Sequence, residues 1–269
     1  MVNILELIEQ ERKNGYSAAN ATAKVCQDMV LEALSASTLS RNATIKGGVV
    51  MRSKTQNVRR ATQDLDIDFI RYSLSDESID RFIVKLNCIP DITFSRIGDI
   101  EELKQQDYHG KRVHILVKDT MGHELRSKID LGVHNRLEIE LEEYCFDIAF
   151  DNEGASLLIN SNEQMFSEKL RSLLKFGSVS TRYKDVFDLY YLSDKLDADK
   201  LAVCMNSYIF GDPQMRENNM EDVIRRIKII FNNRIYRHNL ETTDKKWMDE
   251  KLDVVLDGLV GRLENYLEN

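Results

Sequence analysis

Apolar residues recur with a helical period in the N-terminal part of the chain. Ile4 is followed by Ile8 four positions later, and this spacing places both side chains on one face of a helix over residues 3–13. The same spacing predicts two further helices, over residues 18–36 and 76–86. The chain therefore begins with helices and returns to a helix after its first strands.

Strict alternation replaces the helical period at residues 64–70. The acids Asp64, Asp66 and Asp68 alternate there with apolar residues, which is typical of a strand with one buried face. Residues 42–46 predict a shorter strand that ends at two glycines and leads into a helix. Further strand-like runs follow at 92–96, 112–117, 125–133 and 145–150, with a hairpin turn expected at 121–123.

Only helical spacing remains after residue 160. It predicts helices over 163–176, 182–192, 198–209, 221–233 and 245–266. Strands mixed with helices, followed by helices alone, indicate an α/β (α+β) domain and then a helical one. We expect the domains to span residues 1–155 and 156–269, with the boundary near 151–162.

Composition defines the broad class of protein. The chain has 269 residues, of which 42% are hydrophobic, and no apolar run approaches the ~18 residues of a membrane span. The N-terminus has no basic stretch followed by an apolar one, so we expect no signal peptide. The four cysteines are isolated from one another and form no metal or redox pair. These features predict a cytoplasmic protein without membrane contact.

Charge is unevenly distributed along the chain. The formal net charge is 37 − 45 = −8, yet residues 223–246 contain seven Lys and Arg against two acids, a local charge of +5. An acidic average argues against a dedicated nucleic-acid coat but allows a local basic patch. The stretch is either a contact for nucleic acid or an ordinary solvated helix face.

The strand with three acids has a glycine pair before it. Gly47 and Gly48 end one strand and open a helix, with fifteen residues between Gly48 and Asp64. A helix start that allows close backbone approach accepts phosphate well. The alternate acids share a face of their strand, where they hold a divalent cation or simply line a solvent-exposed edge strand.

Further charged residues follow at positions where helices and strands are predicted. Asp130 stands among apolar residues on a predicted strand, and Lys169 lies beside the apolar face of a predicted helix. Arg182, Asp185 and Asp188 recur every three residues and share one helix face. Taken separately, the helical residues are better explained as surface ion pairs.

In this order, the motifs resemble the nucleotidyltransferase superfamily of the DNA polymerase β type. Three further features make the chain similar to the AbiEii/AbiGii toxin family. They are Lys46 before the glycines, the Glu168-Lys169-Leu170 motif, and the series Arg182, Asp185 and Asp188. The resemblance covers about residues 44–192. It implies a nucleotidyltransferase-like mixed sheet with flanking helices, followed by a helical C-terminal domain.

The resemblance also implies roles for individual residues. The metal-binding acids would be Asp64, Asp66 and Asp130, with Mg²⁺ or Mn²⁺ as the cofactor. The catalytic set would be these three acids together with Lys169 and Asp188. The nucleotide-binding set would be Gly47, Gly48, Arg60, Lys169, Arg182 and Asp185. Asp68 has no counterpart in the superfamily pattern, and Gly48 replaces a serine that many relatives carry.

The implied reaction is transfer of a nucleotide from a nucleoside triphosphate to an acceptor hydroxyl. The expected acceptor is the 3′ end of tRNA, with the protein acting as the toxin of a toxin–antitoxin or abortive-infection system and an antitoxin protein as a partner. Two alternatives stay open. One is a nucleotidyltransferase acting on a small molecule or a protein, and the other is a nucleotide-binding module without catalysis.

Overall fold

The computed structural model describes residues 2–105 and 108–267. The chain divides into two compact units, Met1–Asn160 and Ser161–Asn269, and each is considered by itself. The division lies within the region 151–162 where the boundary was expected, and Asp151–Asn160 is a strand of the first unit.

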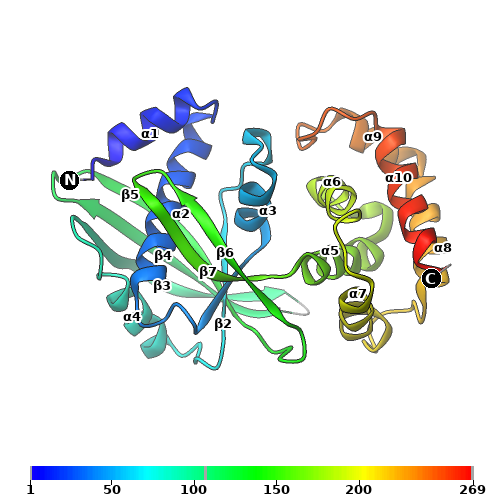
Figure 1. The fold of residues 1–269 in the computed structure, drawn as a ribbon, viewed down its shortest axis with the longest axis horizontal. Helices are drawn as coiled ribbons and strands as arrows, with labels where there is room; N and C mark the ends of the chain where they lie inside the picture. Colours follow the sequence, from blue (N-terminus) through cyan, green and yellow to red (C-terminus); the bar gives the residue numbers. More distant parts are fainter. Residues whose placement is uncertain (1, 106–107, 268–269) are drawn as a thin grey trace. The chain divides into compact units, whose positions relative to one another are not determined.

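The first unit is built on a mixed sheet that has seven strands within the described residues, in the order β3-β4-β5-β2-β1-β7-β6 (Figure 1). The strands are β1 Ala43–Lys46, β2 Leu65–Phe69, β3 Ile92–Gln105, β4 Tyr108–Asp119, β5 Glu124–Val133, β6 Leu141–Ile148 and β7 Asp151–Asn160. β2 runs antiparallel to β1 and parallel to β5, and β1 runs parallel to β7. The fold class predicted from the sequence is therefore confirmed.

Strand β2 lies in the middle of the sheet, between β5 and β1. Its apolar residues Leu65, Ile67 and Phe69 are at most 2% exposed, as the alternation predicted. The interpretation of its acids as the outer face of a solvent-exposed edge strand is wrong, because β2 has hydrogen-bonded neighbours on both sides.

The described residues of the first unit form four α-helices. They are α1 Ile4–Lys13, α2 Ala18–Ala36, α3 Gly47–Thr55 and α4 Asp76–Lys85. α2 packs against β5, β6 and β7 (Figure 1), and its buried side chains include Val25 and Met29 at 0% exposure. Helix α1 packs on α2. A single turn of 3-10 helix, Val58–Arg60, connects α3 to the segment before β2.

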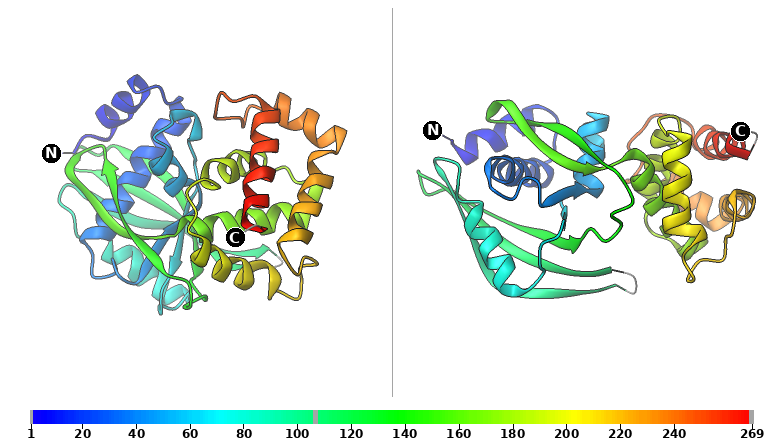
Figure 2. Two further views of the ribbon diagram at one scale, coloured as in Figure 1. Left: turned by 45° about the vertical axis from the view of Figure 1, so that its right-hand side comes forward. Right: turned by 60° about the horizontal axis from the view of Figure 1, so that its bottom comes forward.

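The hairpin of β3 and β4 is longer than its neighbour in the sheet. β3 and β4 pair as far as Gln105 with Tyr108, whereas the pairing of β4 with β5 stops at Lys111. The two strands thus continue past β5 as a ribbon (Figure 2). The predicted hairpin turn at 121–123 is confirmed: it joins β4 to β5, and Gly122 adopts a φ of +87° there.

The described residues of the second unit form helices joined by loops, and none of them forms a strand. Its helices are α5 Asn162–Phe176, α6 Tyr183–Leu192, α7 Ala198–Met205, α8 Met220–Phe231, α9 Arg234–Thr242 and α10 Leu252–Glu264. Shorter turns span Gly177–Val179, Asn206–Phe210 and Asn265–Leu267. Two predicted helices were too long: α7 gives way to a π-helical turn, and α10 begins only at Leu252. Helix α9 was not predicted. No helix among residues 2–105 and 108–267 is long and apolar enough to cross a membrane.

Candidate active site

A single row of directly opposed residues crosses four strands of the sheet. The strand register pairs Lys46 with Asp66, Asp66 with Asp130, and Asp130 with Arg112. Opposed residues of neighbouring strands project from the same face of a sheet. This charged row (Lys46, Asp66, Asp130 and Arg112) therefore has two carboxylates at its centre and a cation at each end.

Asp66 holds the central position of the charged row. Burial raises the pKa of its carboxyl to about 6; nearby Lys46 opposes the rise, and the neighbouring acids Asp130, Asp64 and Asp68 add to it. A carboxylate in such surroundings is stabilised by an added positive charge. A cation bound beside Asp66 would therefore favour the ionised form of its carboxyl.

The glycine pair lies directly against this acid. Gly47 begins α3 with a φ of +67°, and a Cβ atom at this position would lie 2.6 Å from Oδ2 of Asp66. Both the left-handed conformation and the lack of space require glycine here. The start of α3 therefore approaches Asp66 more closely than any other residue type would allow.

Gly48 is required for a different reason. A Cβ atom on Gly48 would lie 2.4 Å from Oγ1 and 2.7 Å from Cβ of Thr62. The Thr62 side chain thus occupies the space that a side chain at position 48 would need. Lys46, the residue before α3, provides no side-chain cap for it within the described part of the chain. The first amides of α3 are suited to an anionic group such as phosphate.

The other acids of the site are paired with cations. Asp64 precedes β2 and lies 2.9 Å from Lys128. Asp68 is 5% exposed and lies 2.7 Å from Lys46. Asp130 accepts two hydrogen bonds from Arg112, at 2.7 and 2.8 Å. The carboxylates of Asp64, Asp68 and Asp130 thus each have an ion-pair partner.

The residues present suit Mg²⁺ in part. Within residues 2–105 and 108–267, no three His, Cys, Asp or Glu side chains converge on a point that could hold a metal ion. Mg²⁺ needs only one or two carboxylates when phosphate oxygens and water complete its shell. Asp66 with Asp64 or Asp130 supplies such a set of oxygen donors. The set of three acids expected from the sequence stays a prediction.

A second charged cluster lies in the helical unit. Nζ of Lys169 on α5 lies 2.6 Å from Asp185 and 2.9 Å from Asp188, both on α6. Asp188 is fully buried and also accepts a hydrogen bond of 3.0 Å from the indole nitrogen of Trp247. Lys169 is therefore held between two acids, one of which has its position set by Trp247.

The two arginines expected at the nucleotide occupy different surroundings. Arg60 is 3% exposed at the end of the turn before the acid strand, whereas Arg182 is exposed and immediately precedes α6. Their roles as nucleotide contacts stay predictions. Sequence reasoning did not select Arg112, Thr62 or Trp247, because each reaches its partner only through packing between distant segments.

The basic stretch 223–246 is largely neutralised by ion pairs. Its cations pair with acids inside and outside the stretch: Arg225 with Asp222, Lys228 with Glu264, Arg237 with Asp253, and Lys245 with Asp244. Three of these four acids lie outside residues 223–246. The local charge of +5 therefore overstates the positive potential of this surface.

Comparison with known families supplies the classification. The family described as "Nucleotidyl transferase AbiEii toxin, Type IV TA system" matches residues 30–258, most of the chain. The chain belongs to this family. It is thus a nucleotidyltransferase, related to the toxins of type IV toxin–antitoxin systems, and the family and enzyme class predicted from the sequence are confirmed.

Two solved structures are similar to this AbiEii-family chain. One is an antigenic nucleotidyltransferase-like protein from Paracoccidioides brasiliensis, with 14% identity, a TM-score of 0.43, and coverage of 86% of this chain and 97% of that one. The other is the antibiotic-resistance factor ANT(2'')-Ia, with 15% identity, a TM-score of 0.41, and coverage of 69% and 92%. No curated protein matches the sequence.

Proposed function

We propose that this AbiEii-family enzyme transfers a nucleotide from a nucleoside triphosphate to an acceptor hydroxyl, with Mg²⁺ or Mn²⁺ as the cofactor. The observation that carries the proposal is the charged row beside the Gly47-Gly48 turn. In this row, the carboxylates could bind a metal cation, and Lys46 and Arg112 could contact the negatively charged triphosphate. The start of α3 beside the row could accept a phosphate group.

Different residues of the first unit would bind the metal and the phosphate groups of the nucleotide. Asp66, with Asp64 and Asp130, would hold the metal, which when bound stabilises negative charge on the triphosphate oxygens. The first amides of α3 would accept a phosphate group at Gly47 and Gly48. Lys46 and Arg112, at the two ends of the charged row, would offset the charge that the triphosphate brings.

In the transfer step, the acceptor oxygen attacks the α-phosphorus of the nucleotide. A bond forms between these two atoms, the bond from the α-phosphorus to the bridging oxygen of the β-phosphate breaks, and pyrophosphate leaves with the electron pair. The proton of the acceptor hydroxyl passes to the Asp130 carboxylate. Both carboxylate oxygens of Asp130 accept hydrogen bonds from Arg112, so this role requires Arg112 to exchange Asp130 for a phosphate oxygen.

Lys169 and Asp188 complete the proposed set. The resemblance assigns Lys169 to the triphosphate, and its ion pairs with Asp185 and Asp188 would orient its ammonium group. The acceptor we propose is the 3′ end of tRNA, and the proposed biological role is that of a growth-inhibiting toxin countered by an antitoxin protein. Both follow from the family and not from a contact in this chain.

The test is to incubate the purified protein with Mg²⁺, total RNA and each labelled nucleoside triphosphate in turn. We expect label in the tRNA band of a denaturing gel from at least one triphosphate. Label on protein or on a small molecule would support the same chemistry with another acceptor and overturn the tRNA assignment. A complete lack of transfer to every acceptor would overturn the proposal.

Two variants test the catalytic residues within this assay. Asp66→Ala and Lys169→Ala should each abolish label transfer and growth inhibition while the protein remains folded by circular dichroism. Lys175→Ala is a matched control, because Lys175 is also on α5 but lies outside the Lys169 cluster. An Asp66→Ala protein with full toxicity would favour the non-catalytic nucleotide-binding alternative.

A further inference from the structure

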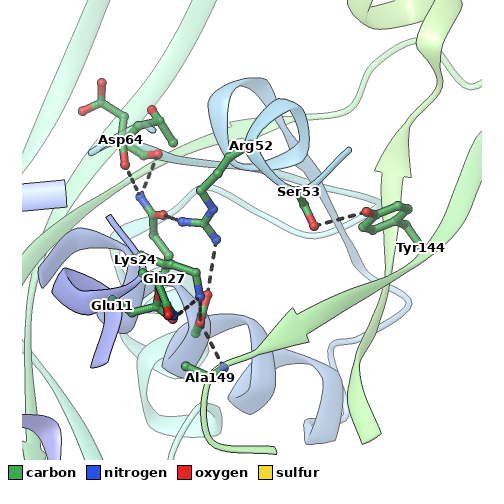
Figure 3. Close-up of polar contacts among 11 residues, drawn as sticks. Glu11, Lys24, Gln27, Arg52, Ser53, Asp64, Tyr144 and Ala149 are labelled. Carbon is green, nitrogen blue, oxygen red and sulfur yellow. Dashed lines mark hydrogen bonds and ion pairs between the residues drawn. The ribbon is translucent and has the colours of Figure 1, made fainter. Parts of the chain in front are cut away.

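A buried hydrogen-bond network joins helix α2 to the segment that leads into the acid strand (Figure 3). Gln27 of α2 is 1% exposed. Its Nε2 atom donates to two backbone carbonyls of that segment, 3.1 Å to Thr62 and 3.3 Å to Asp64. One side chain therefore holds both ends of a three-residue stretch.

The orientation of this amide is determined by its partners. Nε2 faces two carbonyl oxygens, which only accept, while Oε1 accepts from Nη1 of Arg52, which only donates. Arg52 belongs to α3, the helix that begins at Gly47 and Gly48. Gln27 thus connects the helix that carries the glycine pair to the segment that carries Asp64.

Arg52 is itself anchored by buried charges. Its Nη2 atom lies 3.2 Å from Asp28, which is fully buried. Asp28 also accepts from Lys24 at 2.6 Å and from the backbone amide of Ala149 at 3.2 Å (Figure 3). Glu11 of α1 closes the set with a contact of 2.9 Å to Lys24. We call these five side chains the Gln27 network (Glu11, Lys24, Gln27, Asp28 and Arg52).

We propose that Gln27 is a positioning residue for nucleotidyl transfer. The stretch that it holds carries the Thr62 side chain, which lies against Gly48, and Asp64, which lies directly before β2 and two residues before Asp66. Without Gln27, these two groups lose the hydrogen bonds that set their backbone relative to α3. The inference rests on the proposed function, because it assigns Asp64 and Asp66 to the metal.

A purely structural role would have different consequences. Gln27 would then contribute only to stability, and each folded molecule would bind metal and react as the wild type does. A positioning role predicts weaker metal binding and slower transfer in molecules that are fully folded. Loss of a group that orients metal ligands typically costs about 10–100-fold in metal affinity or activity.

The test compares Gln27→Met with the wild type, using the full chain. Methionine has nearly the same length but neither donates nor accepts in this network. We expect Mn²⁺ binding without nucleotide, measured by electron paramagnetic resonance, to weaken about tenfold, and kcat per folded molecule to fall about 10–100-fold. Gln10→Met, on the exposed face of α1, is the matched control and should match the wild type in both measurements.

A second variant guards against misfolding of the first. Gln27→Glu retains an acceptor for Arg52 but places a carboxylate oxygen against the two carbonyls, so the network can fold while the stretch is displaced. We expect the same weakening of Mn²⁺ binding. Wild-type Mn²⁺ affinity and wild-type kcat in the folded fraction of either variant would overturn the inference.

Failure of this inference is distinguishable from failure of the proposed function. A wild-type protein that transfers no label from any triphosphate overturns the proposed function. A wild-type protein that transfers label, together with Gln27 variants that bind Mn²⁺ and transfer equally well, overturns the positioning role alone.

Discussion

The proton of Asp66 affects folding as well as chemistry. Burial raises the pKa of this carboxyl to about 6 from an ordinary value of 3.8. Between these two pH values the folded chain holds a proton that the unfolded chain has lost. The free energy of unfolding therefore falls as the pH rises through this window, and it stays lower above it.

We expect Asp66→Asn to stabilise the metal-free protein at neutral pH. At about 1.4 kcal/mol per pKa unit, the gain is at most about 3 kcal/mol. Thermal melting in EDTA should show the advantage growing between about pH 4 and pH 6 and then remaining constant. A variant that melts at or below the wild-type temperature at pH 7 would contradict this account of Asp66.

Arg112 donates hydrogen bonds to both carboxylate oxygens of Asp130, the residue opposite Asp66 in the strand register. Arg112→Gln should free the Asp130 carboxylate, so Mn²⁺ should bind several-fold more tightly in the absence of nucleotide while transfer slows. Arg112→Lys should restore charge but not the two parallel hydrogen bonds. Titration of Mn²⁺ with and without triphosphate measures both effects, with Arg126→Gln, at an exposed position of β5, as the control. Unchanged Mn²⁺ affinity in Arg112→Gln would show that Arg112 does not compete with the metal.

At the scale of residues, sequence reasoning selected the acids and glycines of the site but not their partners. Gly47, Asp66 and Asp130 could be chosen because their order along the chain is distinctive. Arg112 meets Asp130 only through the register of β4 and β5, and Gln27 meets Asp64 only because α2 packs on the sheet. Contacts between distant segments leave no local pattern in a single sequence.

Helix α1 is attached to the sheet through its first residue. The amide of Ile4 donates to Oδ2 of Asp119 at 3.1 Å, and His123 contacts the same oxygen at 2.8 Å. Burial opposes the ionisation of Asp119, but the hydrogen bonds from Ile4 and His123 outweigh it and lower its pKa to about 2. One carboxylate therefore joins the start of α1 to the turn between β4 and β5.

This attachment predicts a stability that depends on pH at acidic values. Because the pKa of Asp119 is lowered in the fold, its contribution is present above about pH 4 and is lost as the pH falls toward about 2. Asp119→Asn should lower the free energy of unfolding by about 2 kcal/mol at pH 7, and the difference from wild type should vanish near pH 2. Urea titrations across this range measure it, with Asp147→Asn, at an exposed position of β6, as a control; a constant difference would contradict the account.

At the scale of elements, helices and strands with a regular apolar spacing were predicted correctly, whereas those formed by mostly polar segments were missed. α2 and β2 were predicted within a residue or two because their apolar spacing is regular. β7 was missed because Asp151-Asn-Glu-Gly is typical of a turn, and its strand conformation comes from pairing with β1 and β6. α9 was missed because it is short and mostly polar, with Tyr236 and Leu240 as its buried residues.

The chain divides into two compact units, and each contains fully buried apolar side chains. Ile45, Ile67 and Ile115 are fully buried in the first unit, and Phe166 and Phe187 in the second. A chain of about 160 residues buries about 70% of its unfolded surface, which is enough for independent folding.

We expect residues 1–160 alone to fold cooperatively and to bind Mn²⁺ but to transfer no nucleotide, because Lys169 and Asp188 are absent. Circular dichroism, Mn²⁺ titration and the label-transfer assay test the three parts of this prediction. The same fragment with Asp66→Asn should bind Mn²⁺ more weakly. An unfolded fragment would contradict the independent folding of residues 1–160, and a fragment that transfers label would contradict the need for Lys169 and Asp188.

The Gln27 network bears on how the enzyme should be produced and compared with its relatives. The match to the family begins at residue 30, so Glu11, Lys24, Gln27 and Asp28 all precede it. A protein trimmed to residues 30–258 would keep the whole family match and lose four of the five side chains of the Gln27 network, among them Gln27, whose side chain bonds the acid segment. If Gln27 positions that segment as we propose, such a truncated protein would be recognised by its sequence and still transfer nucleotide poorly, so its inactivity would not argue against catalysis by the full chain.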